Sequence, residues 1–435
     1  MISFRASHIL FCLLFLLLCG CQPKVYLMPP PAGIETGESF FELSGSAAQE
    51  NLLHTLYATN RVPIGSANTR IGYTIFPSDT LEIGFLGYSV GYEGMTWDDL
   101  YRESLKMDRD DDLLLRKEFV RPMVEYDSNG MTSDPKEAEL FFRMINAALE
   151  QSFTHDITVY VHGANSNFYR ATAQGAQFFH FTGHNSVILS FAWPSAENLF
   201  RYTTDVRHAK KTVATFSRLL EVLADRTAAR KINIIAYSAG AQIVAPGLAY
   251  LHEVYPRLSS KEIREKLRIG EVYFAAPDTA FKAFVEGYLK FKDIVERTTI
   301  TLNRNDRVLL LAALQNGVSR LGRPDLNELG ERELLAILEL LMTADLDVID
   351  VAASTALDIG GGHDYWYNNP WVSSDLLMLL LFKAGPRERG LVSVYNDAGA
   401  VLFLFPDDYA EKIPDIMGQL KQMMQERRGK EKDWR

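Results

Sequence analysis

The sequence predicts a doubly wound α/β fold with a mostly parallel sheet, and three observations support this prediction. Short apolar segments alternate with longer amphipathic segments from about residue 135 to residue 302. This alternation is typical of right-handed β–α–β crossovers, which cover both faces of a parallel sheet with helices. A serine flanked by small residues follows one apolar segment directly. Hydrophobic residues make up 47% of the chain and charged residues 23%, which is enough apolar material for a large core.

Residues 1–20 are predicted to be a secretory signal peptide. Arg5 precedes an apolar run from Ile9 to Leu18, which is too short to span comfortably a hydrocarbon layer about 30 Å thick. The sequence Leu18-Cys19-Gly20-Cys21 resembles the lipobox of bacterial lipoproteins. That resemblance implies lipidation of Cys21 and a membrane partner reached through the lipid. Gln22 after the cysteine implies the outer membrane, with the protein facing the periplasm.

Residues 21–49 are predicted to be a tether, because they contain Pro29-Pro30-Pro31 and show no helical or strand periodicity. The chain has three cysteines, all at or before Cys21, so we expect no disulfide, no cysteine nucleophile and no thiolate metal site. The net charge of −10, without a long basic stripe, argues against a nucleic-acid partner.

Residues 50–385 are predicted to form the main domain. Three β-like segments begin it, and we expect them to be antiparallel strands: 52–58, 81–90 and 118–126. The expected later strands are 157–161, 186–191, 232–236, 271–275, 298–302 and 346–351. The expected helices are 135–152, 171–179, 206–224, 239–252 and 327–342. The last of these helices either caps the functional site or packs beside it.

Residues 386–435 are predicted to be a C-terminal extension made of a hairpin and a helix. The hairpin strands are expected at 391–395 and 400–405, because Asn396-Asp397-Ala398-Gly399 between them is a good turn sequence. The helix is expected at 409–426.

Ala236-Tyr237-Ser238-Ala239-Gly240 is predicted to be a nucleophile elbow, a sharp strand-to-helix turn that requires small neighbours around its serine. The first position departs from the usual G-x-S-x-G pattern, since Ala236 replaces glycine. Ser238 would lie at a helix N-terminus, where backbone N–H groups favour developing negative charge. The competing interpretation is a serine that only caps a helix.

His162-Gly163 lies at the end of an earlier apolar strand and is predicted to begin an oxyanion loop. In such sites the backbone N–H groups of Ala164 and Ala239 would together hold the oxyanion. His162 would organise the loop and would not be the base. Trp193 follows a neighbouring strand, where it either lines a substrate pocket or packs in the core.

A serine nucleophile needs a histidine base oriented by a carboxylate, in the chain order serine, acid, histidine for this fold. Two histidines follow Ser238 in the sequence, His252 and His363. His252 lies in or just after the elbow helix, which would hold it away from the hydroxyl, so His363, which follows the last predicted strand, is the expected base. Asp306 is the preferred acid, and Asp278 is the alternative. Both aspartates follow strands that end at the same edge of the sheet.

Together these segments resemble exported bacterial α/β hydrolases, a family of unknown function that is similar to serine esterases. The resemblance covers residues 52–383 and implies an α/β-hydrolase fold with hydrolytic chemistry. It rests on Tyr-Ala-Thr-Asn-Arg at Tyr57–Arg61, Val-His-Gly at Val161–Gly163, Phe-Ala-Trp-Pro at Phe191–Pro194, the elbow at Ser238, Ala-Ala-Pro-Asp at Ala275–Asp278, Arg-Asn-Asp-Arg at Arg304–Arg307, and Gly-His at Gly362–His363.

The leading hypothesis is a lipid-anchored serine hydrolase, resembling a carboxylesterase or lipase, that forms an acyl-enzyme on Ser238 from a small-molecule or lipid acyl substrate. Two alternatives are an envelope acyltransferase with the same triad and a non-enzymatic binding protein with a hydrolase fold. No cofactor and no metal are expected. His180 and His184 are spaced like a helical metal pair, but Gly183 between them indicates a helix end.

Overall fold

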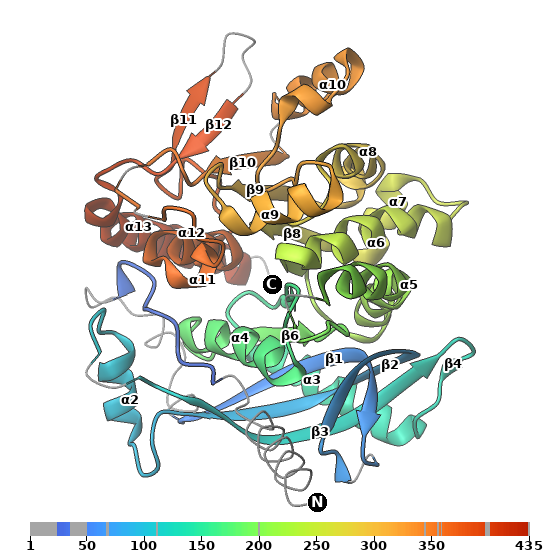
Figure 1. The fold of residues 1–435 in the computed structure, drawn as a ribbon. Coiled ribbons are helices and arrows are strands. Elements are labelled where there is room, and N and C mark those ends of the chain that lie inside the picture. Colours follow the sequence, from blue (N-terminus) through green and yellow to red (C-terminus); the bar gives the residue numbers. More distant parts are fainter. Residues whose placement is uncertain are drawn as a thin grey trace, which may run out of the picture.

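The structure is a computed structural model that describes residues 24–34, 50–66, 69–109, 112–198, 201–342, 345–354, 356–357, 359–395 and 401–433. The predicted signal peptide, Cys21 and the predicted turn at 396–399 lie outside these residues. Within them, one sheet of twelve strands has helices on both sides, which confirms the predicted α/β fold (Figure 1). None of the helices in the described part of the chain combines the length and apolar character needed to cross a membrane.

The strand order across the sheet is β11-β12-β10-β9-β8-β7-β5-β6-β1-β2-β3-β4. All neighbours from β12 to β1 are parallel, whereas β1 to β4 and the β11–β12 pair are antiparallel. The strands are β1 (Leu52–Ile64), β2 (Gly72–Val90), β3 (Leu115–Asp127), β4 (Gly130–Met131), β5 (Ile157–Val161), β6 (Val187–Phe191), β7 (Ile232–Tyr237), β8 (Ile269–Ala275), β9 (Arg297–Leu302), β10 (Leu346–Asp350), β11 (Val392–Tyr395) and β12 (Val401–Leu404).

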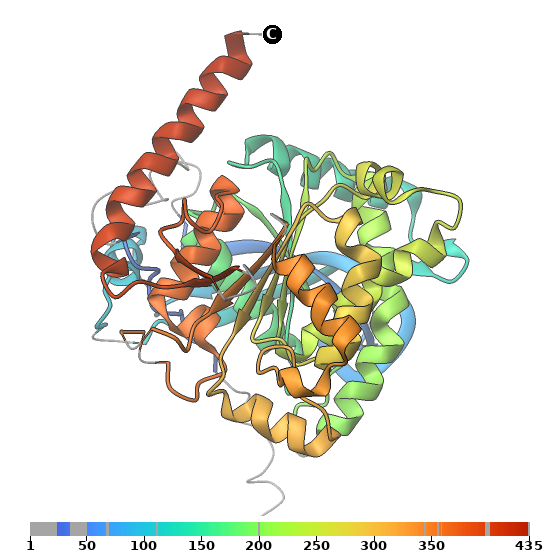
Figure 2. The ribbon, with the colours of Figure 1, turned by 90° about the horizontal axis from the view of Figure 1, so that it is seen from above.

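The central strands are apolar because both of their faces are covered. In β7, Ile234 and Ala236 belong to one core, and Ile235 between them belongs to the other. The first core packs under α3 (Pro135–Gln151), α5 (Tyr202–Arg226), α6 (Ala241–Val254) and α8 (Phe281–Phe291). The second packs under α4 (Phe168–Phe181), α12 (Pro370–Phe382) and α13 (Tyr409–Asp433), which extends outward from the body (Figure 2).

Among the described residues, five further helices connect or flank these elements: α2 (Trp97–Ser104), α7 (Ser260–Leu267), α9 (Arg307–Asn316), α10 (Glu331–Leu341) and α11 (Tyr365–Asn368). The segment predicted as a helix at 327–342 contains the end of a 3₁₀ turn, Leu326–Glu328, followed by α10. Because α10 contacts β10 and α8, it packs beside the sheet.

The predicted C-terminal hairpin and helix are present as β11, β12 and α13, and they are joined to the main sheet and its core. β12 pairs in parallel with β10, with Phe403 opposite Ile349, so the hairpin extends the main sheet. Phe405 and Tyr409 are buried in the second core. The hairpin and helix therefore stabilise the sheet edge.

Residues 24–34 are also packed on the body, which corrects the tether prediction for this part of 21–49. The Leu27 N–H donates to Leu113 O at 2.8 Å, and the Ala32 N–H donates to Pro370 O at 3.0 Å. Ile34 is fully buried. The segment has no periodicity because it docks as irregular chain, through individual side chains and backbone groups.

Candidate active site

The elbow serine lies in a strained backbone conformation between β7 and α6. Ser238 has φ of 51°, in the left-handed region that non-glycine residues rarely adopt. The chain then forms a short 3₁₀ turn, Ser238–Gly240, before α6 begins. A Cβ atom on Gly240 would lie 2.5 Å from the carbonyl oxygen of Val161, so only glycine fits against β5.

Ser238 and His363 are brought together with Asp306, although the three are far apart in the sequence. His363 Nε2 lies 2.7 Å from Ser238 Oγ, and His363 Nδ1 lies 2.6 Å from Asp306 Oδ2. The Asp306 side chain is fully buried, whereas that of His363 retains slight exposure. This arrangement can take the hydroxyl proton of Ser238 onto His363 while the carboxylate accepts a hydrogen bond from Nδ1–H.

Asp306 is held by the loop that follows β9. Its second carboxylate oxygen, Oδ1, accepts a hydrogen bond from the Leu309 N–H at 2.9 Å and so caps the N-terminus of α9. Asn303, which is also buried, donates from Nδ2 to the carbonyl oxygens of Gly360 and Gly362 at 3.2 Å and 2.9 Å. Asn303 therefore ties the loop of the acid to the loop of the histidine.

Asp278 has different partners. Arg320 Nε donates to its Oδ1 at 2.5 Å, and Tyr202 Oη donates to its Oδ2 at 2.8 Å. The backbone N–H of Asp278 donates to Ser238 O at 3.0 Å. Asp278 thus braces the elbow from behind, and the geometry favours Asp306 over Asp278 as the partner of His363.

The predicted oxyanion loop lies directly against the elbow. A Cβ atom on Gly163 would be 2.9 Å from Ser238 Cβ, so the chain passes as closely as glycine allows. The next residue, Ala164, is half-buried, and Ala239 is buried. These positions place two backbone segments beside the serine, as an oxyanion hole requires.

His162 supports the loop from beneath. Its ring stacks on Trp193 with a centroid separation of 5.1 Å, and Trp193 Nε1 donates to His162 O at 2.7 Å. Burial, with Arg61 nearby, lowers the pKa of His162 to about 3, so the imidazole is neutral near pH 7. Trp193 is 0% exposed, which favours the core-packing alternative over a role as a pocket wall.

Two buried charges that sequence reasoning did not assign fix the same loop. Arg61 donates from Nη2 to Ser166 O at 2.7 Å and from Nε to Ala192 O at 3.2 Å. Asp205 accepts from the backbone N–H of Asn165 at 3.0 Å. Arg61 closes the Tyr57–Arg61 motif that contributes to the family resemblance, but the motif assigns it no role. Asp205 has no sequence signal, because it acts on a backbone group that is distant in sequence.

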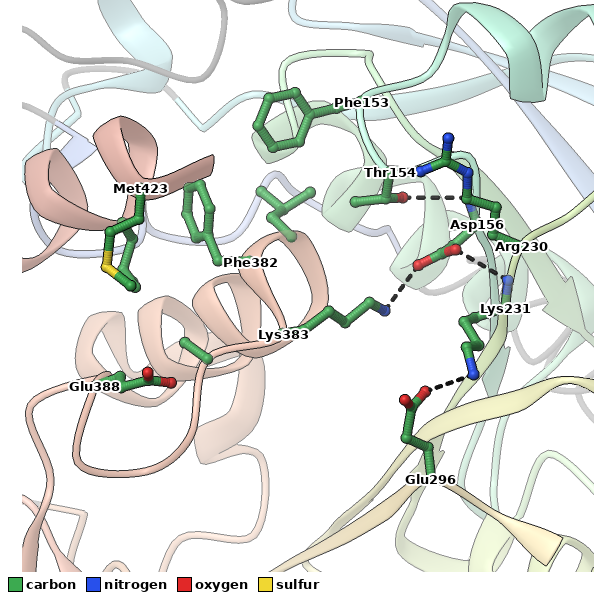
Figure 3. A pocket seen from close by; sticks show the side chains of 13 residues that line it. Phe153, Thr154, Asp156, Arg230, Lys231, Glu296, Phe382, Lys383, Glu388 and Met423 are labelled. Carbon is green, nitrogen blue, oxygen red and sulfur yellow. Dashed lines mark hydrogen bonds and ion pairs between the residues drawn. The ribbon is translucent and has the colours of Figure 1, made fainter. Parts of the chain in front are cut away.

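Two cavities lie away from the triad. The first, of about 350 Å³, is lined by residues that directly precede β5 and β7, whereas Ser238 follows the opposite end of β7. Figure 3 shows the side chains that line this cavity. Four of its charged side chains form two ion pairs, with Lys383 Nζ 2.8 Å from Asp156 Oδ2 and Lys231 Nζ 2.9 Å from Glu296 Oε2. The second, of about 310 Å³, lies between α3 and the amino-terminal ends of β1 and β6. The chemistry available at Ser238 is therefore not located in either cavity.

Across the described ranges, no cluster of three or more histidine, cysteine, aspartate or glutamate residues could hold a metal ion. His180 Nδ1 instead lies 3.0 Å from His184 Nε2, and His180 Nε2 lies 2.8 Å from Ser104 Oγ. Burial lowers the pKa of His180 well below its usual value, and the rings of His180 and the partly buried His184 both pack against Trp97.

A family model described as "Alpha/beta hydrolase of unknown function (DUF900)" matches residues 138–379. The matched region begins in α3 and ends in α12, so it includes the elbow, the oxyanion loop, both aspartates and His363. A search of curated proteins found no significant match.

Proposed function

Since the chain belongs to this α/β-hydrolase family of unknown function, we propose that it is a serine hydrolase, resembling a carboxylesterase or lipase, held in the cell envelope by a lipid on Cys21. The observation that carries the proposal is the continuous chain from Ser238 Oγ through His363 to Asp306, with separations of 2.7 Å and 2.6 Å. The strained elbow and the adjacent Gly163 loop supply the second requirement, a site for the oxyanion.

In the acylation step, Ser238 Oγ attacks the carbonyl carbon of an ester as its proton moves to His363 Nε2. The buried carboxylate of Asp306 accepts from Nδ1–H and stabilises the imidazolium. The carbonyl oxygen becomes an oxyanion, which accepts hydrogen bonds from the Ala164 and Ala239 N–H groups. The C–O bond to the alcohol then breaks, and the alcohol leaves with the proton from Nε2.

In the deacylation step, water attacks the acyl carbon on Ser238 and transfers a proton to His363 Nε2. The second tetrahedral intermediate collapses by breaking the bond to Ser238 Oγ, which recovers the proton. The products are a carboxylic acid and the free enzyme. The arginine and aspartate that brace the oxyanion loop, Arg61 and Asp205, keep it in place during both steps, so little reorganisation is needed.

The test is labelling by a fluorophosphonate, which reacts with an activated serine. The chain from residue 22 is suitable, because every contact described above lies within residues 24–433. Labelling is expected for the parent, none for Ser238→Ala, and a rate lower by about 10³-fold or more for His363→Ala. Ser259→Ala is the matched control. Ser259 caps α7, which leads into the amino-terminal end of β8, whereas Ser238 follows the carboxyl end of β7. A folded parent that takes up no label would overturn the proposal.

The proposed anchor and its envelope location need a separate measurement. The full chain, expressed in a Gram-negative host and fed a labelled fatty acid, is expected to carry label and to fractionate with outer membranes. Cys21→Ala should lose the label. If Cys21→Ala is labelled as strongly as the parent, the lipidation site is wrong.

A further inference from the structure

One helix at the active site exposes leucines to solvent. In α9, Leu309 and Ala312 face the body, whereas Leu311 and Leu314 are 66% and 73% exposed. We define the α9 surface by five exposed apolar side chains, four from the helix and one just after it: Val308, Leu310, Leu311, Leu314 and Val318. A helix of a soluble protein normally turns polar residues outward, so a contiguous apolar face indicates a binding surface.

The α9 surface is coupled directly to the triad. One carboxylate oxygen of Asp306 meets His363, and the other caps the first turn of α9 at the Leu309 N–H. The helix lies at the outer margin of the molecule, at the bottom of Figure 2. A binding partner on the α9 surface would therefore lie close to Ser238.

The charges around the helix favour an anionic partner. Arg307 is the only charged residue in α9, and Arg304 precedes it. Arg304 Nη2 lies 2.8 Å from Asp350 Oδ2, yet its side chain is still 66% exposed. Of the acids beyond the helix, Glu328 accepts hydrogen bonds from Ser319, and Asp325 caps the following 3₁₀ turn. Exposed leucines beside exposed arginines match an anionic lipid surface.

The size of the α9 surface distinguishes between two candidate binding partners, a membrane and a second copy of the chain. Ten helical residues form a cylinder about 15 Å long and about 10 Å wide. One face of it is well short of the roughly 800 Å² per partner that a stable dimer buries. Insertion into a bilayer needs no such area, because each exposed leucine gains from leaving water by itself.

We propose that the α9 surface docks on an anionic phospholipid bilayer and holds the mouth of the active site against it. The acyl substrate would then be a lipid of that bilayer or a molecule dissolved in it. This choice of substrate rests on the proposed serine-hydrolase function. Docking itself does not, because it is measured without turnover.

The experiment is flotation of the chain from residue 22 with vesicles of phosphatidylglycerol and phosphatidylcholine, and with vesicles of phosphatidylcholine alone. The parent is expected to bind the anionic vesicles, and less so at high salt. The Leu311→Gln/Leu314→Gln double variant should bind at least about tenfold more weakly. Leu335→Gln/Met342→Gln, which changes two similarly exposed residues at α10, is the matched control and should bind within about twofold of the parent.

The docking proposal is overturned by no vesicle binding of the folded parent, or by equal binding of the α9 double variant. A parent that sediments as a dimer, and a double variant that is monomeric, would assign the α9 surface to a second copy instead. Fluorophosphonate labelling of the parent separates the two proposals. Labelling without vesicle binding rejects only the docking surface, and vesicle binding without labelling rejects only the serine-hydrolase function.

Discussion

Asp306 and Asp278 are two buried acids at the same edge of the sheet, and their partners give them different tasks. Asp306 meets a histidine and a helix N-terminus, whereas Asp278 is paired with the buried Arg320. Removing the charge of Asp306 changes proton transfer between Ser238 and His363. Removing the charge of Asp278 leaves an uncompensated buried cation, which destabilises the fold.

This contrast is testable with two isosteric variants. Asp306→Asn is expected to lower the fluorophosphonate labelling rate by about 10²–10⁴-fold while the chain stays folded, because His363 loses the carboxylate that orients it. Asp278→Asn is expected to lower the free energy of unfolding by about 3 kcal/mol, since Arg320 loses its charge partner. Denaturant unfolding and labelling are measured on both proteins. The reverse assignment of effects would make Asp278 the acid.

Asn303 is predicted to be a positioning residue, because its Nδ2 group donates to the carbonyl oxygens of Gly360 and Gly362 in the loop that carries His363. Asn303→Ala removes two hydrogen bonds to the histidine loop. It should reduce kcat by about 10-fold to 100-fold and raise KM by less than that. A fluorogenic ester provides both constants and their pH profile. If Asn303→Ala lowers the melting temperature but leaves kcat unchanged, Asn303 has only a structural role.

At the scale of elements, buried charges join β8, β10 and α12. Glu271, Asp347 and Asp375 lie there with Arg389, and one side-chain polar atom of each lacks a hydrogen bond. Asp375 and Arg389 form an ion pair at 2.6 Å with both side chains fully buried. Burial is the largest influence on the three carboxyl groups and raises the pKa of each.

Asp347 is predicted to make stability depend on pH. Burial raises its pKa from 3.8 to about 6, so between these values the folded chain binds a proton that the unfolded chain releases. Its favourable contribution is present below about pH 3.8 and is lost as the pH rises through about 6. Asp347→Asn should therefore raise the free energy of unfolding by up to about 3 kcal/mol near pH 7.5 and by little near pH 4. Urea unfolding at both pH values checks this, and an equal effect at both would contradict it.

The elements were predictable where one periodic pattern dominated. The apolar strands β5, β6 and β7 were predicted within about a residue of their observed bounds. α9 was not predicted, because its leucines point outward as well as inward and give no clear amphipathic signal. β2 begins nine residues before its predicted start, in a bulged region that pairs irregularly with β1.

The site was predictable to a different extent. Ser238, His363 and Asp306 each follow a strand, so the parallel topology alone brings them to one edge. The contacts of Arg61, Asp205 and Asn303 could not be foreseen, because each binds backbone groups whose positions exist only in the folded chain. Sequence patterns thus indicate which groups react, and packing determines what holds them.

At the scale of the whole molecule, residues 24–34 connect parts that are distant in sequence. Starting the chain at residue 35 removes Leu27, Met28 and Ile34 from the second core and should cost on the order of 5 kcal/mol. A chain that starts at residue 24 should unfold like one that starts at residue 22. Thermal unfolding of the three proteins measures this, and identical melting temperatures would show that the segment contributes nothing.

The docking of residues 24–34 also limits how far the protein can travel. Only three peptide steps separate Cys21 from Lys24, which is about 10 Å when fully extended. With lipid on Cys21 as proposed, the folded part of the chain would stay close to the membrane surface and could not reach across the depth of the periplasm. Because the protein would remain at one membrane surface, its reaction partners would be molecules that diffuse within or along the same leaflet.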